Sequence, residues 1–270
     1  MELVRRAVRA RTRPVKTTHV SAGRKSAERV FGLAAAQAAF ATRPDAVMSI
    51  AYTSALRKPL AEMLREAARR RIAYREVEAE ELGRMAQSVH HEGVCLLVAA
   101  RAAPKLSELL KSLHDGGLLL ALDGVENPHN VGAILRSAAY FGAKGLIYTS
   151  AADDAALLPP AARRVAEGGA EFVPVLRVPQ LNAALREARA AHITVIGCDA
   201  HTDDSLDRFE WPGRALVVLG HEQRGLSRDV RAACKDLLRI SGTQHIDSLN
   251  VSVAAGIFLA SYAQAHGAGR

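Results

Sequence analysis

Residues 247–254 read Asp-Ser-Leu-Asn-Val-Ser-Val-Ala and lead directly into an apolar stretch. Polar side chains such as Ser248, Asn250 and Ser252 are costly to bury beside apolar neighbours unless each finds a hydrogen-bond partner. Either Ser248 or Asn250 can cap a helix that starts just after them. The pattern predicts a C-terminal helix over residues 251–265, preceded by a polar loop that belongs to a site.

Two earlier segments have the same character, because each joins glycine and polar residues to an apolar run. Residues 220–226 read Gly-His-Glu-Gln-Arg-Gly-Leu, and residues 130–136 read Asn-Val-Gly-Ala-Ile-Leu-Arg. Ligands of parallel α/β sheets bind beyond the carboxyl ends of the strands. The three segments are therefore expected to form one composite site.

From residue 118 onwards, short apolar runs alternate with helical stretches. The runs occupy residues 118–122, 145–148, 193–198, 215–219 and 237–240. Such alternation predicts an α/β fold, with a parallel sheet covered by helices on both faces.

Residues 26–100 predict a second, smaller α/β unit. Helical periodicity appears at residues 27–41 and 60–71, and apolar runs at 47–51 and 94–100 predict strands. Four arginines lie toward the end of the second helix: Arg65, Arg69, Arg70 and Arg71. They suit either a solvated face near the negative end of the helix dipole or a surface that faces RNA.

Residues 1–25 are expected to form a basic, flexible arm. They contain eight basic residues and one acidic residue, whereas the whole chain has a net charge of +8. A basic arm on a nearly neutral body is typical of nucleic-acid contact. A solvated tail without a partner and a mitochondrial presequence are the alternatives. Residues 101–117, with Pro104 and two adjacent glycines, predict a linker.

The bulk composition is that of a globular protein, with 49% apolar and 24% charged residues. No stretch of 18 apolar residues occurs, so we expect no membrane span. Cys95, Cys198 and Cys234 are scattered, which favours reduced thiols in the cytoplasm over disulfides or a zinc site. His90 and His91 are neighbours that do not share a helix face, and no metal is expected.

The first segment offers residues suited to binding a phosphorylated ligand. Asn130 is predicted to cap the helix that follows it. Arg136 projects from about the second turn, and its planar guanidinium suits a phosphate. In the second segment Glu222 can accept hydrogen bonds. Taken singly, the same residues fit a plain helix cap, a surface ion pair and an acidic first turn.

Other residues suit a flat heterocycle. Gly220 and Gly225 allow unusual backbone angles and close approach to a ligand. Ile240, Gly242 and Leu249 can form an apolar wall with exposed backbone groups. These five residues predict a pocket for a nucleotide-like group.

In this order and spacing, the three segments resemble the three motifs of the SpoU (TrmH-type) RNA ribose 2′-O-methyltransferases. The first motif is matched by Asn130 and Arg136. The second, Gly-x-Glu-x-x-Gly-Leu, is matched by residues 220–226, and the third by Ile240 and the Ser-Leu-Asn-Val-Ser of residues 248–252. The resemblance covers about residues 118–270.

The resemblance implies a SPOUT-type α/β domain with a deep trefoil knot, a homodimer, and a tRNA or rRNA substrate. It implies that S-adenosylmethionine lies against Gly220, Ile240 and Leu249. It also implies that Arg136 contacts the RNA phosphate and assists loss of the ribose proton. Because an arginine stays charged at neutral pH, we favour Arg136 as an electrostatic clamp on the developing alkoxide. The implied catalytic set is completed by Asn130, Glu222, Ser248 and Asn250.

The upstream unit carries a second resemblance. Residues 30–32, Val-Phe-Gly, and residues 90–94, His-His-Glu-Gly-Val, are similar to the opening and closing motifs of the substrate-binding domain that precedes many SpoU methyltransferases. That domain resembles a ribosomal-protein-type RNA-binding fold.

The chain departs from the family pattern near the implied cofactor loop. Ser241 and Gly242 replace a Pro-Met pair, Gln244 replaces a glycine, and His221 stands where Asn or Ser is common. A non-catalytic RNA-binding relative is therefore an alternative. A knotted base methyltransferase is another, against which only the resemblance of the Ser-Leu-Asn-Val-Ser run to the ribose enzymes speaks. A nucleotide-binding oxidoreductase is a weaker one, because the chain lacks both a Gly-x-Gly-x-x-Gly motif after the first strand and a phosphate-binding P-loop.

Overall fold

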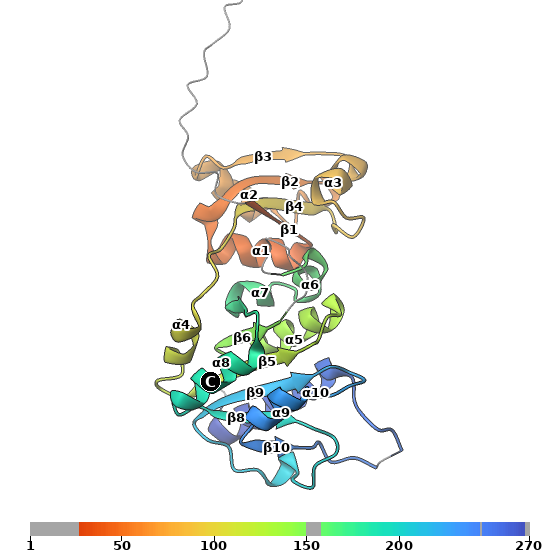
Figure 1. Ribbon diagram of the computed structural model, residues 1–270. Coiled ribbons are helices and arrows are strands. Elements are labelled where there is room, and N and C mark those ends of the chain that lie inside the picture. Colours follow the sequence, from red (N-terminus) through yellow and green to blue (C-terminus); the bar gives the residue numbers. More distant parts are fainter. Residues whose placement is uncertain (1–26, 150–157, 244, 268–270) are drawn as a thin grey trace, which may run out of the picture.

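The computed structural model describes residues 27–149, 158–243 and 245–267. These residues form two lobes, each built on its own sheet (Figure 1). We call residues 27–99 the N-terminal lobe and residues 106–267 the C-terminal lobe. The expectations about the arm at 1–25 and about Gln244 concern residues outside the described ranges.

The N-terminal lobe is a four-stranded sheet of order β1-β4-β2-β3, in which only β2 and β3 are parallel. Its strands are β1 (Ala27–Phe31), β2 (Val47–Tyr52), β3 (Ala73–Glu76) and β4 (Val94–Ala99). Its helices are α1 (Leu33–Thr42), α2 (Ala61–Arg69) and α3 (Ala79–Ala86), with 3-10 turns at Pro44–Ala46 and Ser54–Leu56. Helices α1 and α2 cover one face of the sheet, and α3 covers the other.

The helix predicted over residues 27–41 is wrong at its start. Residues 27–31 form β1, because all five of them pair with β4. Gly32 then adopts φ 92° and begins α1, so tertiary pairing overrides the local alanine-rich pattern. Strand β3 was not predicted, since all four of its residues are exposed and give no alternating pattern.

The arginines on α2 lie on a solvated face. Arg69 and Arg70 both pair with Glu66, and Arg70 also reaches Asp45. Because these two arginines already have acidic partners, the structure favours a paired surface over a free basic patch for them.

The C-terminal lobe is a six-stranded sheet of order β10-β8-β9-β5-β6-β7, and all its neighbouring strands are parallel. The strands are β5 (Gly117–Asp123), β6 (Gly145–Tyr148), β7 (Val175–Arg177), β8 (Thr194–Cys198), β9 (Arg214–Gly220) and β10 (Asp236–Leu238). The predicted parallel α/β sheet is confirmed. Only the three-residue strand β7 was missed among these strands.

Helices cover both faces of this sheet, as predicted. One face holds α5 (Pro128–Tyr140), α6 (Pro160–Val165), α7 (Gly169–Phe172) and α10 (Val251–His266). The other holds α4 (Leu106–Lys111), α8 (Leu181–Ala190) and α9 (Arg228–Ala233). A 3-10 turn occupies Leu206–Arg208. Alternate residues of β5 point into the two hydrophobic cores, one on each face of the sheet. Leu120 packs with α5, and Leu119 packs with α8. Helix α4, inside the predicted linker, buries Leu109 in the second core.

Candidate active site

The strand order creates a crevice at the carboxyl ends of β5 and β9. These two strands are neighbours although nearly a hundred residues separate them, and Asp123 lies opposite Gly220 at their ends. From β5 the chain moves outward to β6 and β7, and it then returns to the other side of β5 through β8 and β9. Such a reversal of strand order is where ligands bind in open α/β sheets. The Ser227 amide donates to Asp123 Oδ2 at 2.6 Å and joins the two loops.

The cap of α5 is not the predicted one. Asn127 caps the helix by accepting from the His129 amide at 2.9 Å, and Pro128 occupies the first turn. The prediction that Asn130 is the cap is wrong, because proline at the first helical position sets the start of the helix three residues earlier. The side chain of Asn130 is therefore available for other contacts.

Asn130 joins the three polar segments. Its Nδ2 donates to Glu222 Oε1, and its Oδ1 accepts from Asn250 Nδ2 at 3.2 Å. Asn250 caps α10, because its Oδ1 accepts from the Ser252 amide at 2.8 Å. The expected composite site therefore exists as a chain of hydrogen bonds from the loop after β9, across α5, to the start of α10.

The loop after β9 depends on its glycines. The His221 and Gly225 amides exchange hydrogen bonds of 3.1 and 2.8 Å, and Gly225 adopts φ 65°. A Cβ on Gly220 would lie 2.3 Å from the carbonyl carbon of Gly225 and 2.5 Å from the Leu226 nitrogen. Such distances are far inside van der Waals contact, so only glycine fits at position 220.

A pocket of about 750 Å³ opens beside this network, a volume typical of small-molecule sites. Its walls include the three predicted cofactor residues Gly220, Ile240 and Leu249, together with Glu222 and Ser248. Ser241, which departs from the family pattern, donates to Asp207 Oδ1 at 2.7 Å. Hydrogen bonds, first of all that from Ser241, hold the pKa of Asp207 below its usual range. The loop that carries Ser241 is thus hydrogen-bonded to the 3-10 turn at Leu206–Arg208.

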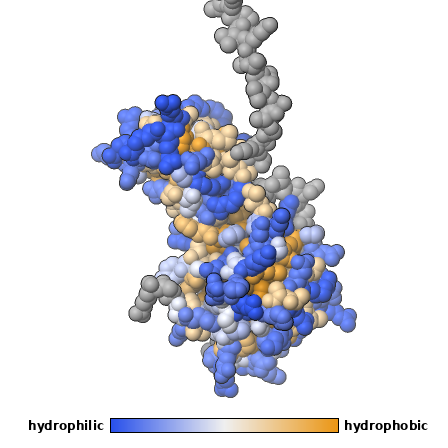
Figure 2. All heavy atoms as spheres, turned by 90° about the vertical axis from the view of Figure 1, so that its left-hand side faces the viewer, coloured by the Kyte–Doolittle hydropathy of each residue, from blue (hydrophilic) through white to orange (hydrophobic). Residues whose placement is uncertain are grey.

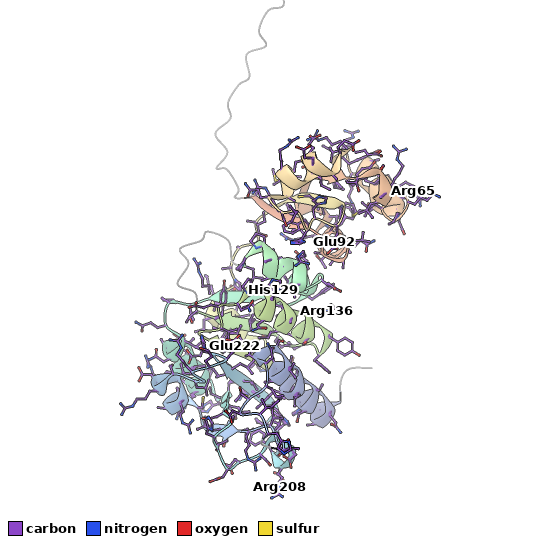
Figure 3. All side chains as sticks on the ribbon, turned by 90° about the vertical axis from the view of Figure 1, so that its right-hand side faces the viewer. Arg65, Glu92, His129, Arg136, Arg208 and Glu222 are labelled. Atoms are coloured by element: carbon purple, nitrogen blue, oxygen red, sulfur yellow. The ribbon has the colours of Figure 1, made fainter. Side chains whose placement is uncertain are left out.

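Arg136 is a predicted catalytic residue that belongs neither to the network nor to the pocket wall. It projects from α5 and forms an ion pair of 2.7 Å, through Nη1, with Glu167 Oε1. Six residues separate it from Asn130, so the two side chains leave the helix about 120° apart. Figure 3 shows Arg136 and Glu222 beside α5, with Glu92 above them where the two lobes meet.

Two further residues of the pocket were not predicted. Asp199 follows β8, is only 8% exposed, and accepts from the His201 amide at 2.9 Å. It also pairs with Arg231 of α9, and both residues line the pocket. The position of Asp199 at the end of a strand could have indicated it, whereas Arg231 carried no local signal.

His90 and His91 form hydrogen bonds within the turn that precedes β4. The Gly93 amide donates to His91 Nδ1 at 3.0 Å, and the His90 amide donates to Ser88 Oγ at 3.1 Å. Within the described residues, no three His, Cys, Asp or Glu side chains gather as metal ligands do. None of the helices in those ranges is both long and apolar enough to cross a membrane.

The Cys198 thiol lines the same pocket, and burial raises its pKa to about 11. Because the thiolate is the reactive form, we expect iodoacetamide to label Cys198 slowly in the folded protein at pH 8 and rapidly after unfolding in urea. Cys95, whose pKa burial also raises to about 11, is the internal comparison. Mass spectrometry of the labelled peptides measures both. Equal rates for Cys198 in the folded and unfolded chain at pH 8 would contradict the burial argument.

Comparison with known proteins identifies this architecture. Residues 117–260 match the model of the SpoU rRNA Methylase family, and residues 29–104 match the model named RNA 2′-O ribose methyltransferase substrate binding. An Escherichia coli O157:H7 protein named uncharacterized tRNA/rRNA methyltransferase YfiF is 34% identical over 87% of this chain and 67% of its own length.

Two further relatives have more specific names. The 23S rRNA (guanosine-2′-O-)-methyltransferase RlmB of a Burkholderia species is 42% identical over 67% of this chain and 73% of its own length. The crystal structure of the SpoU methyltransferase AviRb from Streptomyces viridochromogenes in complex with AdoMet superposes with a TM-score of 0.75. That match has 26% sequence identity and covers 90% of this chain and 92% of the other. The family match spans more than half of the chain and includes all three polar segments, so this protein belongs to the SpoU methyltransferase family.

Proposed function

We propose that this protein transfers a methyl group from S-adenosylmethionine to a ribose 2′-hydroxyl of tRNA or rRNA. The observation that carries the proposal is the hydrogen-bonded chain from Glu222 through Asn130 to Asn250 at the edge of the pocket. This chain unites the three segments whose spacing matches the family, and its member Glu222 lines the pocket. The name of the Burkholderia relative supports ribose over base methylation, and 23S rRNA over tRNA.

The pocket fits the implied cofactor. Ile240 and Leu249 supply apolar surface to the pocket wall. Gly220 also lines the pocket, and it packs closely against the backbone of Gly225 and Leu226. Asp199 and Arg231 add charged groups to another part of the wall. When bound, S-adenosylmethionine supplies an electrophilic methyl group on a positively charged sulfur.

The residues of this chain would position and activate the hydroxyl. Holding two reactants in line can lower a barrier by roughly 7–11 kcal/mol. Asn130 and Asn250 would fix the loops that shape the ribose site, and Ser248 lies in the pocket wall for a contact with the sugar. Arg136 would grip the neighbouring phosphate and stabilise the developing alkoxide, while the proton passes to phosphate or water.

The N-terminal lobe would bind the RNA. Part of its surface is hydrophilic in the space-filling view of Figure 2, and the match to a substrate-binding model supports this role. The basic arm at residues 1–25 would add phosphate contacts, and residues 101–117 would join the substrate-binding domain at 26–100 to the methyltransferase domain at 118–270. We propose a cytoplasmic location, with which an RNA substrate is consistent.

A homodimer and a deep knot complete the proposal. Helix α10 is rich in apolar residues, yet Val253 is 50% exposed and Ile257 is only partly buried. Apolar helix faces are normally buried, and a second copy of the chain would cover Val253 and Ile257. Support for the knot is the path before α10, where Arg239 hydrogen-bonds with Asp204 and Leu206 of an earlier loop.

The dimer can be tested with Val253→Asp. The variant should leave the monomer stable, because position 253 is exposed in the first turn of α10, where an acid suits the helix dipole. In a dimer it would bury an unpaired charge at a cost of several kcal/mol, so we expect the dimer to dissociate at micromolar concentration. Light scattering after gel filtration measures the mass. Val89→Asp, at an apolar residue that is 84% exposed on the N-terminal lobe, is the control. A wild type that is monomeric at all concentrations would disprove the dimer.

The reaction itself is tested by transfer of labelled methyl from S-adenosylmethionine to unmodified RNA, split into tRNA and rRNA fractions. Label in a 2′-O-methylnucleoside is the expected result. Label on a base would show that the protein methylates a base and not a ribose. Absence of both label and cofactor binding would favour the non-catalytic relative, which the divergent Ser241 and Gly242 suggest.

A further inference from the structure

The turn between α6 and α7 has an unusual backbone. Glu167 adopts φ 45° and Gly168 adopts φ 90°, so two successive residues lie in the left-handed region. For a residue other than glycine this costs about 1 kcal/mol or more. The surrounding structure must therefore hold Glu167 in place.

One side of this turn lies against the part of α5 that carries Arg136. Glu167 Oε1 accepts from Arg136 Nη1 in the 2.7 Å ion pair. A Cβ on Gly169 would come within 2.8 Å of the Leu135 carbonyl oxygen and 3.1 Å of the Arg136 Cα. The turn thus contacts both the backbone and the guanidinium of Arg136.

The other side of the turn lies against the N-terminal lobe. A Cβ on Gly168 would lie 2.6 Å from the Cβ of Ala38 on α1. Glu171 is only 7% exposed, and its carboxylate accepts two hydrogen bonds of 2.8 and 2.9 Å from the Arg43 guanidinium. Arg101, which follows the lobe, donates two hydrogen bonds of 3.1 Å to Glu171, one to the carboxylate and one to the backbone carbonyl. Figure 1 shows α7 between α1 and α5.

The two kinds of contact differ in burial. The Arg43 and Glu171 side chains are 12% and 4% exposed, so this pair anchors the turn to the N-terminal lobe. The Arg136 and Glu167 side chains are 60% and 50% exposed. An ion pair at that exposure adds at most about 1 kcal/mol to stability. The Glu167 contact is therefore better explained by an effect on Arg136 than by an effect on folding.

We propose that Glu167 is a positioning residue that orients Arg136, and that docking of the N-terminal lobe through Gly168 and Glu171 sets the place of Glu167. The inference rests on the proposed methyl transfer, in which Arg136 binds the phosphate and the alkoxide. A contact through Nη1 leaves further N–H groups of the guanidinium to meet RNA. The lobe that would bind RNA is thereby linked to the catalytic arginine by the five residues 167–171.

Glu167→Gln and Glu167→Gly test the positioning role. Glutamine removes the charge, whereas glycine removes the side chain and relieves the left-handed backbone, so at least one variant should fold. We expect kcat to fall about tenfold in both, with the RNA KM and the cofactor Kd within twofold of wild type. Glu81→Gln, which breaks a similarly exposed pair with Arg75, is the matched control.

The link to the N-terminal lobe is tested with Arg43→Lys, which keeps the charge but loses the two-point contact with Glu171. We expect a smaller fall in kcat, and no further fall when Arg43→Lys is combined with Glu167→Gln. Fully additive losses would show that the two sites act separately and would overturn the link.

A spectroscopic readout separates this inference from the proposed reaction. The NMR signal of the Arg136 Nε–H group should report an ordered side chain in the wild type and a mobile one in Glu167→Gln, whether or not methyl transfer is detected. An equally ordered signal in both proteins, or unchanged kcat in an active enzyme, would overturn the positioning role. A lower RNA KM with unchanged kcat would overturn it too, and would make Glu167 a competitor of the phosphate. An inactive wild type with the expected NMR change would remove the proposed reaction alone.

Discussion

Replacing Arg136 with alanine is expected to lower kcat for methyl transfer by about 10²–10³-fold, while cofactor affinity stays within twofold of wild type. The size follows from removing one charged donor aimed at the developing oxyanion, which costs about 2.7–4 kcal/mol. Cofactor affinity should hold, because Arg136 is not among the residues that line the pocket. Single-turnover assays give the rate, and calorimetry gives the cofactor Kd.

Arg136→Lys sharpens this test. Lysine keeps the charge but lacks the planar fork that grips a phosphate, so we expect it to restore only part of the rate. The fold should be intact in both variants, since the side chain is 60% exposed and its partner Glu167 is half exposed. Full activity in an Arg136→Ala protein that still binds RNA and cofactor would exclude the assigned role.

The second large effect is expected from Gly220→Ala. The new methyl group would meet backbone atoms of Gly225 and Leu226 at 2.3–2.5 Å, and backbone atoms cannot rotate away as a side chain can. The loop must move, and with it the hydrogen bonds between His221 and Gly225. Overpacking of this kind costs about 1–3 kcal/mol, which corresponds to a loss of cofactor affinity of about 5–150-fold if the strain falls on the pocket.

Gly213→Ala is the matched control for Gly220→Ala. Position 213 precedes the same strand, and a Cβ there would have no neighbour within 4 Å. Cofactor binding and the melting temperature should both be unchanged in the control. Gly220→Ala with wild-type cofactor affinity would show that the loop does not form the cofactor wall.

The spacing of motifs predicted which segments meet where the contacts are set by the ends of strands. Gly220 is the last residue of β9, Leu249 lies just before α10, and both line the pocket with Ile240. Prediction was poorer where a neighbouring proline or a distant strand decided the outcome. Asn130 was taken for a cap that Asn127 provides, and residues 27–31 were taken for helix although they pair with β4.

The sequence by itself determined most of the buried strands of the C-terminal lobe, because apolar periodicity and glycine or proline positions act locally. It also determined which loops can approach a ligand, since only glycine tolerates the crowding at position 220. The tertiary structure decided which polar groups meet. Asn130 lies 92 residues from Glu222 and 120 from Asn250 in the chain, and Glu167 reaches Arg136 from a separate turn. Such contacts depend on strand order and lobe docking, which are set by the packing of the whole core and not by any local pattern.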